Sequence, residues 1–534
     1  MGKHHRKRMS KSSKCKSPFT SSDLEDFSSY DGEKEPMFQV KTSKAIGRYM
    51  VAKNDIKAGK IIIRENPLVV GPCVGGKIQC IGCYKNLEDE DKKFRCMGCG
   101  WPMCSKQCPG IDEIYGHTKI ECSVLKECHS KTFFTWDDIE DMRTNYHSIV
   151  PLRCLILKST DPTSFQTLMD MESHNEIRKN IPAVWLSNQN TVVDTILGKW
   201  KLTEYTAEEI HTICGILEVN AFEIGHQGVN IRGIYPTAFL MSHDCVPNTN
   251  HSDDGINFTL TVRASVDIPE NHPITLSYAY TLQGTLRRRE HLLDNKFFEC
   301  YCRRCSDPSE LGTFVSALLC PKCKTGYVLS DDPLNNDSTW SCNNTKEEGY
   351  SCPGYTISSK SVRLLIDRIS REYETIDCND IDSLEFFLKK YRNVLHPNHY
   401  ICLGVKLSLS QLYGKIDGYL IYELTDKQLS RKIEICKEIM QTFDVIEPGL
   451  TKLRGVTLYE LHAPLMVLLT REFERGFLTK DDIKSRLREV VSCLIDARNI
   501  LELEPKISTE GAMGVAAQEA LLQIKDWEKI IGKI

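Results

Sequence analysis

Candidate metal ligands stand in closely spaced pairs between residues 80 and 122 of this 534-residue chain. A Cys-x2-Cys pair directs two thiolates at one ion from a tight turn, and structural zinc takes four such ligands in a tetrahedron. Gly82 and Gly98, inside two of the pairs, fit these turns. Eight ligands predict two zinc ions with no open position for hydrolytic chemistry. Interleaving the pairs predicts one set of Cys80, Cys83, Cys104 and Cys108, and another of Cys96, Cys99, His117 and Cys122.

Two further groups of cysteines follow later in the chain. A Cys-x-Cys-x2-Cys motif supplies three thiolates, and its best candidate for a fourth ligand lies upstream: Cys245 with Cys300, Cys302 and Cys305. The last group joins a good Cys-x2-Cys knuckle to a pair with nine residues between its members: Cys320 and Cys323 with Cys342 and Cys352. That second spacing is loose for a zinc ribbon, so a partly used knuckle in a loop is the alternative. The full prediction is four structural zinc ions.

The number and placement of cysteines indicate the compartment. The chain has 24 cysteines, although a large chain with its own core has little need of disulfides. Its first residues are polar and basic, without the apolar segment of a secretory signal. We therefore expect metal binding in the reducing cytoplasm, the nucleus or both. The single cysteines of the C-terminal part are expected to be small buried hydrophobes; they are Cys378, Cys402, Cys436 and Cys493.

Composition excludes some classes of protein. A net charge of −4 gives no general attraction to nucleic acid or to membranes. No run approaches the eighteen apolar residues of a membrane span. Basic residues are few in the first cysteine-rich segment, and acids at 88–91 oppose phosphate contact, so direct nucleic-acid binding is not expected. Residues 1–36 are predicted to be a disordered tail, whose basic cluster at 6–8 is either a solvated charge run or a nuclear-import signal.

The elements that must position these groups are both strands and helices. Short apolar runs between turn signals predict strands from residue 39 to 70, and clean alternation predicts another over 258–264. Residues 130–230 are predicted to be mostly helical, as is the chain from 360 to its end. There, apolar side chains repeat every three or four residues, and Thr479 is a predicted N-cap. The two apolar stripes are Leu429, Ile433, Cys436, Met440 and Phe443, and Ile483, Leu487, Val490, Leu494, Ala497 and Leu501.

The order of these motifs resembles a known family. A segment at 100–105 resembles the MYND zinc finger; after it come His-x-Cys-x-Pro-Asn at 243–248, a strand ending at Tyr278, and the Cys-x-Cys-x2-Cys motif. This order is similar to that of the SET and MYND domain (SMYD) family, and the Cys-Pro-Lys-Cys at 320–323 is similar to its arthropod SmydA-type branch. The resemblance implies an α+β, multidomain fold in which a finger splits a SET domain and a tetratricopeptide-like helical array follows.

The resemblance also implies domain boundaries. After the tail at 1–36, the expected segments are the first part of the SET domain at 37–72, the MYND finger at 73–128 and a helical insert at 129–230. The SET core resumes at 231–285. The remaining segments are a post-SET zinc motif at 286–306, an extra zinc-binding segment at 307–358 and a helical domain at 359–534.

The family resemblance further implies an activity and a site. SET enzymes transfer a methyl group from S-adenosyl-L-methionine to a protein lysine, histone or non-histone, and Tyr278 matches the tyrosine that completes the lysine channel. The implied cofactor-binding residues are Gly47, Arg48, Tyr49, Asn220, Ser242, His243, Tyr278 and Phe298, the last of which stacks on adenine. The finger is expected to bind proline-containing peptides, and the chain is expected to be a monomer.

Three positions depart from the family pattern. Tyr49 stands where the family has a glycine, which is used where backbone approaches closely or φ is positive. Ser242 replaces an asparagine and loses an amide that both donates and accepts. Pro273, after His272, has no N–H for the sheet. These departures leave an alternative open, in which the SET and MYND segments form a catalytically silent scaffold for protein interaction and transcriptional regulation.

Overall fold

The computed structural model describes residues 36–44, 46–88, 94–129, 139–226, 229–344, 352 and 354–531. The predicted N-terminal tail, with its basic cluster, and most of the acidic run at 88–91 lie outside these residues. No helix in the described part of the chain has the length and apolar character needed to cross a membrane.

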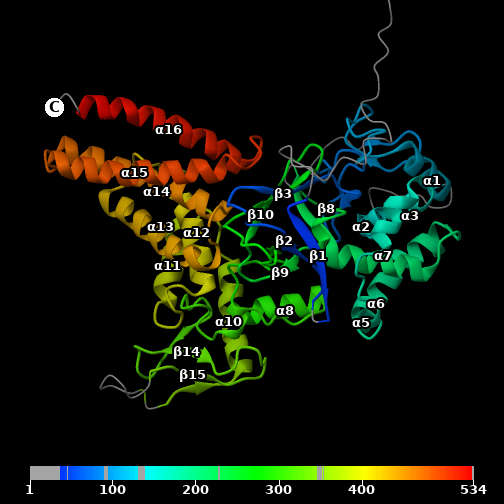
Figure 1. Cartoon of the computed structure of the whole chain (residues 1–534), viewed down its shortest axis with the longest axis horizontal. Helices are drawn as coiled ribbons and strands as arrows, with labels where there is room; N and C mark the ends of the chain where they lie inside the picture. Colours follow the sequence, from blue (N-terminus) through cyan, green and yellow to red (C-terminus); the bar gives the residue numbers. More distant parts are fainter. Residues whose placement is uncertain are drawn as a thin grey trace, which may run out of the picture.

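Short strands from two distant parts of the chain form the centre of the molecule (Figure 1). β3 is the edge of a three-stranded sheet of order β10-β11-β3, and β4 is the edge of another of order β4-β8-β7. β9 and β12 pair in parallel, and β1 pairs with β2. The strands are β1 (Phe38–Ser43), β2 (Gly47–Ala52), β3 (Ile61–Glu65), β4 (Val69–Pro72), β7 (Phe222–His226), β8 (Val229–Ile234), β9 (Ser242–His243), β10 (Thr249–Asp253), β11 (Leu260–Ala264) and β12 (Thr275–Leu276).

The predicted finger and the helical insert share one hydrophobic core beside these strands. Trp101 of the finger packs edge-on against Tyr146 and Trp200 of the insert, with ring centroids 5.3 and 6.1 Å away. Thr206 and Glu209 form a capping box that starts α7. The finger contributes β5 (Phe94–Arg95), β6 (Pro102–Met103) and α1 (Lys119–His129). The insert contributes α2 (Ile139–Tyr146), α3 (Ile149–Thr160), α4 (Pro162–Met169), α5 (Asn175–Arg178), α6 (Pro182–Asn188), the π-helix η2 (Gln189–Lys199) and α7 (Ala207–Asn220).

Two short helices and a small sheet follow the central strands. The sheet has the order β13-β14-β15-β16 and lies at the lower edge of Figure 1. It packs against the first C-terminal helices, with Trp340 and Val328 in their shared core. These elements are α8 (Thr285–Lys296), α9 (Arg303–Ser306), β13 (Leu318–Leu319), β14 (Tyr327–Ser330), β15 (Trp340–Cys342) and β16 (Thr356–Ile357), and the short 3-10 helix η3 (Ala238–Leu240) precedes β9.

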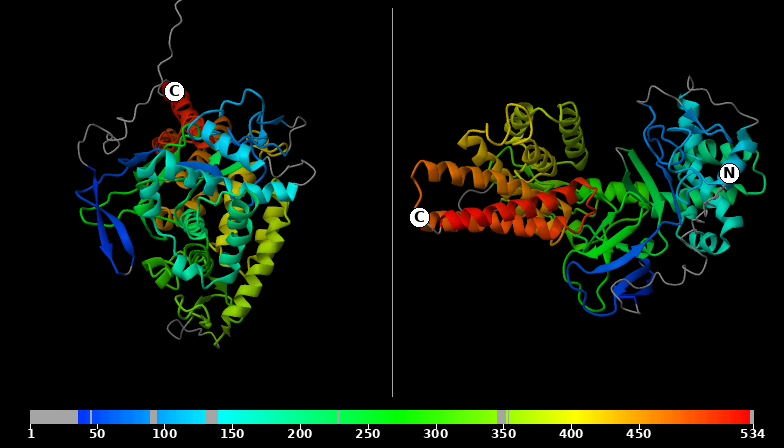
Figure 2. Two further views of the ribbon diagram at one scale, coloured as in Figure 1. Left: turned by 90° about the vertical axis from the view of Figure 1, so that its right-hand side faces the viewer. Right: turned by 90° about the horizontal axis from the view of Figure 1, so that it is seen from above.

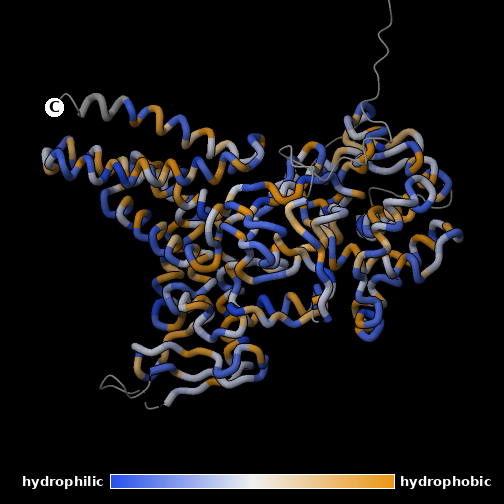
Figure 3. Tube along the Cα trace, viewed as in Figure 1, coloured by the Kyte–Doolittle hydropathy of each residue, from blue (hydrophilic) through white to orange (hydrophobic). Residues whose placement is uncertain are grey.

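The C-terminal helices pack as an array, as predicted. From above, the last of them project away from the central strands as a long arm (Figure 2), and apolar residues recur along each of them (Figure 3). The predicted stripe of α15 is buried throughout, and Thr479 caps that helix in a capping box with Asp482. In α13, Ile433 and Met440 are only half-buried. The helices are α10 (Ser359–Glu374), α11 (Ile381–Tyr391), α12 (Tyr400–Leu412), α13 (Asp426–Ile446), α14 (Lys452–Glu474), α15 (Lys480–Leu501) and α16 (Thr509–Ile531).

A glycine joins this array to the central strands. Gly449, between α13 and α14, has φ +80°, and a Cβ there would lie 2.0 Å from the carbonyl oxygen of Ser265. The next residue, Leu450, donates its N–H to that same oxygen at 2.8 Å. Only a residue without a side chain permits this approach.

One prediction about the single cysteines is wrong. Cys402, Cys436 and Cys493 are buried as predicted, but Cys378 is exposed. Cys378 lies in the turn between α10 and α11 rather than on an apolar helix face, so no neighbouring helix covers it.

Candidate functional site

The structure brings the predicted metal ligands together in four sets of four. In each set the ligand atoms lie within 4.8 Å of one another. Within the sets, sulfur–sulfur distances include 3.5 Å for Cys80–Cys108, 3.6 Å for Cys96–Cys122, 3.5 Å for Cys245–Cys305 and 3.6 Å for Cys320–Cys352. Tetrahedral zinc with Zn–S bonds of about 2.3 Å separates its sulfurs by about 3.8 Å, whereas a disulfide needs about 2 Å. The donor sets therefore fit zinc and not disulfides.

The knuckle glycines are needed for space rather than for backbone conformation. A Cβ on Gly98 would lie 2.6 Å from Sγ of Cys122, and one on Gly82 would lie 3.0 Å from Sγ of Cys108. In both knuckles the position of the glycine is the one at which a ligand sulfur from another segment approaches the turn.

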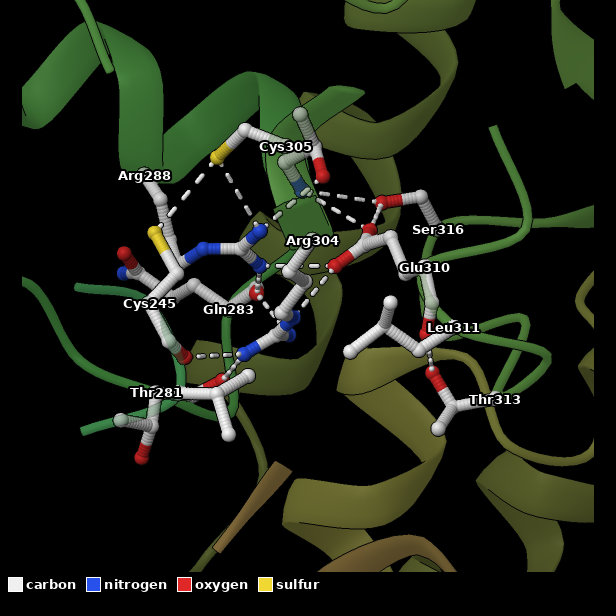
Figure 4. A network of polar contacts seen from close by, with 12 residues as sticks. Cys245, Thr281, Gln283, Arg288, Arg304, Cys305, Glu310, Leu311, Thr313 and Ser316 are labelled. Atoms are coloured by element: carbon white, nitrogen blue, oxygen red, sulfur yellow. Dashed lines mark hydrogen bonds and ion pairs between the residues drawn. The ribbon is translucent and has the colours of Figure 1, made fainter. Parts of the chain in front are cut away.

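A buried network of charged side chains lies beside the set that contains Cys245 (Figure 4). Arg288 of α8 directs Nη2 at Sγ of Cys305, 3.5 Å away. Its Nη1 lies 2.8 Å from Glu310, which also pairs with Nε of Arg304 at 2.9 Å. Arg304 in turn donates to the carbonyl oxygens of Cys245 and Thr281 at 3.2 and 2.7 Å.

The charges in this network balance one another. Burial alone would raise the pKa of Glu310, but the charges of Arg288 and Arg304 lower it to about 2. Four thiolates on one zinc carry a net charge of −2, and Arg288 places a cation beside them. The sequence patterns did not reveal Arg288, Arg304 or Glu310, because arginines on a short helix and a glutamate in a loop have no distinctive spacing.

Three of the predicted cofactor residues meet next to this zinc set. The rings of His243 and Tyr278 are 5.3 Å apart, and Phe298 lies 5.8 Å from the first and 6.3 Å from the second. The backbone N–H of Tyr278 donates to Nδ1 of His243 at 3.0 Å. Nδ1 is therefore the acceptor and Nε2 carries the proton, 3.2 Å from Sγ of Cys245. The histidine thus connects the metal set with the tyrosine.

The hydroxyl group of the half-buried Tyr278 is oriented by one hydrogen bond. It donates its proton to the carbonyl oxygen of Met241, just before β9. Burial raises the pKa of Tyr278 above its ordinary value, so the hydroxyl stays protonated. Because its hydrogen is bonded to Met241, the oxygen is left with lone pairs for another contact.

Two of the other predicted cofactor residues contact one loop between α4 and α5. Arg48 donates to the carbonyl oxygen of Asp170, and Asn220 donates to that of Glu172 at 2.8 Å. From the same loop, His174 packs edge-on against Phe297, the neighbour of Phe298, with ring centroids 5.9 Å apart. This loop, 170–174, was missed in the sequence because it has no motif of its own.

The three departures from the family pattern are accommodated. In β2 the positive φ belongs to Gly47, at +68°, whereas Tyr49 lies in the strand opposite Lys41. The ladder bonds around Pro273 are made by its neighbours: Ala52 donates to the carbonyl of His272 and Ile274 donates to Met50. The missing N–H of Pro273 therefore breaks neither bond. Ser242 pairs with Thr275 across β9 and β12.

Comparisons with known proteins agree with this geometry. A family model described as "SET domain" matches residues 47–279. The chain is 30% identical over 325 residues to the Drosophila melanogaster SET domain-containing protein SmydA-8, isoform B, covering 58% of this chain and 66% of that protein. It is 24% identical to the Arabidopsis thaliana histone-lysine N-methyltransferase ASHR2, and the match covers 51% of this chain and 72% of that protein. It is also 24% identical to the human histone-lysine N-methyltransferase SMYD3, and this match covers 48% of this chain and 59% of that protein.

The extent of these matches is limited. The chain spans just under two thirds of the length of the two SmydA-8 isoforms, at 66% and 65%. Among solved structures, the SET domain of LSMT bound to lysine and AdoHcy aligns over 92% of this chain and 89% of its own, at 11% identity. Its TM-score of 0.24 is too low to establish a common overall fold.

The SET match and the relatives confirm the α+β fold that was predicted for this chain. The matched residues start at Gly47, which has positive φ, and end one residue after Tyr278. Between them they include both zinc sets of the finger and Cys245. The chain therefore contains a SET domain, and its sequence is similar to those of SMYD proteins, SmydA-8 among them.

Proposed function

We propose that this protein methylates the side-chain amine of a lysine in a protein substrate, histone or non-histone, using S-adenosyl-L-methionine. The observation that carries the proposal is the contact of Tyr278 with His243 and Phe298 beside a cysteine set, inside the matched SET domain. The cofactor would supply a methyl group bound to a sulfonium sulfur. The lone pair of a neutral lysine would attack the methyl carbon, and the sulfur would leave as the thioether of S-adenosylhomocysteine. The protein has to align the lysine amine with the methyl carbon and to stabilise the transition state electrostatically.

The residues of this chain would divide that work. Tyr278 presents oxygen lone pairs for weak C–H···O contacts with a methyl group, because its own hydrogen is bonded to Met241. Phe298 would stack on the adenine, held in place by the cysteine set that follows it. The residues that would contact the rest of the cofactor are Gly47, Arg48, Tyr49, Asn220, Ser242 and His243. With its pKa raised, the hydroxyl of Tyr278 stays protonated, so it is not assigned as a general base.

Isothermal titration with S-adenosylhomocysteine tests cofactor binding. Saturable binding is expected, and no binding at high micromolar concentration would overturn the proposal. Tyr278→Phe is then expected to keep this binding but to lose methylation of the chain itself or of a protein substrate. Tyr280→Phe is the matched control, because Tyr280 is two residues away with 55% of its surface exposed; it is expected to keep methylation.

The alternative function is a catalytically silent scaffold. Ser242 favours it, because serine lacks the carboxamide that the family's asparagine provides. A chain that holds four zinc ions and fails to bind S-adenosylhomocysteine would match this alternative.

We infer further that the finger binds proline-containing peptides and that the protein acts as a monomer in the cytoplasm, the nucleus or both. Met97 and Ile114 support peptide binding, since they expose 84% and 78% of their surfaces on the finger. Replacing both with serine is expected to abolish peptide capture without changing zinc content.

A further inference from the structure

One arginine of the helical insert lies between the finger and the central strands. Arg153, on α3, makes a two-pronged ion pair with Glu121 of α1: Nε lies 2.9 Å from Oε1, and Nη2 lies 3.1 Å from Oε2. The side chain of Arg153 is 10% exposed and that of Glu121 is 2% exposed. Pairing of this kind fixes geometry as well as charge.

Glu121 connects this pair to the second zinc set of the finger. Its Oε2 lies 3.0 Å from Nδ1 of His117, and the other ring nitrogen, Nε2, lies 3.3 Å from Sγ of Cys99. A carboxylate on the far nitrogen of a ligating histidine fixes the tautomer and the orientation of the ring. Glu121 therefore orients His117 toward the other ligands of that set.

The remaining donors of Arg153 reach two other parts of the molecule. Nη1 donates to the carbonyl oxygen of Val70 in β4 at 2.7 Å and to the hydroxyl of Tyr84 at 2.6 Å. Nη2 donates to the carbonyl oxygen of Ile81, within the first knuckle of the finger, at 3.0 Å. All five N–H groups of this guanidinium are satisfied, and three separate segments depend on one side chain.

The contact with β4 leads toward the predicted cofactor residues. A Cβ on Gly71 of β4 would lie 2.6 Å from a methyl group of Val150, so α3 packs directly on this strand. β4 pairs with β8 and β8 with β7. β7 starts two residues after Asn220. A shift of Arg153 would therefore move β4, and the backbone hydrogen bonds between β4, β8 and β7 would carry that movement to a strand next to the proposed cofactor site.

We propose that Glu121 and Arg153 are a positioning pair that couples the second zinc set of the finger to the SET sheet. The finger is then a structural part of that sheet rather than a freely attached module. Loss of a ligand from this zinc set loosens β4 and β8 through the pair. This coupling does not depend on methyl transfer, so it stands or falls separately from the proposed activity.

A double-mutant cycle read by hydrogen exchange tests the coupling. His117→Ala removes one ligand, and it is expected to speed amide exchange in β4 and β8 at least tenfold. In Arg153→Met, exchange there is already fast, and adding His117→Ala is expected to change it less than twofold. Equal effects of His117→Ala with and without Arg153→Met, or no effect of His117→Ala on these strands, would overturn the proposal.

One further variant keeps the test decisive. If Arg153→Met fails to unfold cooperatively, Glu121→Gln takes its place, because it keeps the size of the side chain and removes the charge that Arg153 pairs with. Native mass spectrometry is expected to show that Glu121→Gln releases the second finger zinc to a chelator first, whereas release in an unchanged order contradicts the pair's role.

Arg143→Met is the matched control. Arg143 of α2 also pairs with a finger carboxylate, Glu88, at 2.9 Å, but it is 38% exposed, and Glu88 does not belong to either set of zinc ligands. It is expected to leave both exchange and zinc release as in the unmodified chain. If Arg143→Met speeds exchange in β4 and β8 as Arg153→Met does, and releases zinc as Glu121→Gln does, then any contact with the finger has this effect. That result would also overturn the proposal.

Discussion

The backbone N–H of Tyr278 donates a 3.0 Å hydrogen bond to Nδ1 of His243, and the opposite side of that imidazole faces Sγ of Cys245. One ring thus spans the distance between the proposed catalytic tyrosine and a cysteine of the post-SET set. Burial lowers the pKa of His243 to about 4, which keeps the ring neutral and able to accept this bond.

Replacing the acceptor is expected to affect the tyrosine directly. His243→Phe keeps a ring but leaves the buried N–H of Tyr278 without a partner, at a cost of about 1–3 kcal/mol in the free energy of unfolding. Hydrogen exchange at Tyr278 is expected to accelerate correspondingly. His243→Asn, whose Oδ1 can take the place of Nδ1, is expected to restore slow exchange; equal exchange in both variants would contradict the role of this bond.

Removing Arg288 tests the charge balance of the buried network. Arg288→Met leaves Glu310 and the thiolates with one cation fewer, and breaking a buried pair costs about 3–5 kcal/mol. Its neighbour Arg287, 36% exposed, pairs with Glu290 at 3.1 Å and with Asp367 of α10. Because these pairs are partly exposed to solvent, Arg287→Met is expected to cost less than Arg288→Met. Denaturant unfolding of both variants measures the difference, and equal losses would contradict the network's importance.

Glu65 is expected to make stability depend on pH. Burial raises the pKa of Glu65 to about 7, against hydrogen bonds from the backbone N–H groups of Thr237 and Ala238. The folded chain then holds a proton that the unfolded chain releases near pH 4.5. The contribution of Glu65 to the free energy of unfolding is therefore at its maximum below about pH 4.5. It falls by about 3 kcal/mol as the pH rises from there through 7.

Glu65→Gln keeps an acceptor and removes the titration. Between pH 5 and pH 8 the free energy of unfolding of the unmodified chain is expected to fall relative to that of Glu65→Gln, because only the unmodified chain has the titrating carboxyl group. A difference that stays constant over that range would show that Glu65 titrates normally.

Gly449→Ala is expected to weaken the junction with the C-terminal array. The left-handed backbone costs a residue with a Cβ about 1–2 kcal/mol, and the clash with the carbonyl of Ser265 adds about 1–3 kcal/mol. Gly418 has φ +81°, and a Cβ there would meet no atom of the described residues within 4 Å, so Gly418→Ala carries the backbone cost alone. Urea unfolding midpoints compare the two; equal midpoints would mean that the contact with Ser265 adjusts freely.

Zinc content tests the least regular of the four sets. Four zinc ions per chain are expected by native mass spectrometry, and three in Cys352→Ser, because a set with three thiolates binds far less tightly. Cys378→Ser, at an exposed single cysteine, is expected to keep four. Three ions in the unmodified chain would remove the set at Cys320–Cys352.

The features that the sequence revealed are those with a local spacing. Paired cysteines and the stripe from Ile483 to Leu501 follow from turn and helix periodicity, and the structure groups and buries them as expected. Cys378 was predicted wrongly because nothing local distinguishes a turn cysteine from a buried one. Arg153, Arg288 and Glu310 act through partners far away in the chain, so no spacing could identify them. Tyr49 was judged unfavourable in part because positive φ was expected at its position, whereas the residue with positive φ is Gly47.

The pairing of β3 with β11 has a consequence for how this protein is made. Ile63 of β3 lies opposite Val262 of β11, and β4 likewise pairs with β8, a strand that comes much later in the chain. A ribosome must synthesise the whole finger and helical insert before either early strand finds its neighbour, and such distant pairings form slowly. The nascent chain therefore carries unpaired apolar strands while its first zinc ions can already bind. Fragments that end before β8 leave both strands without their neighbours, and they are expected to need chaperones or to aggregate.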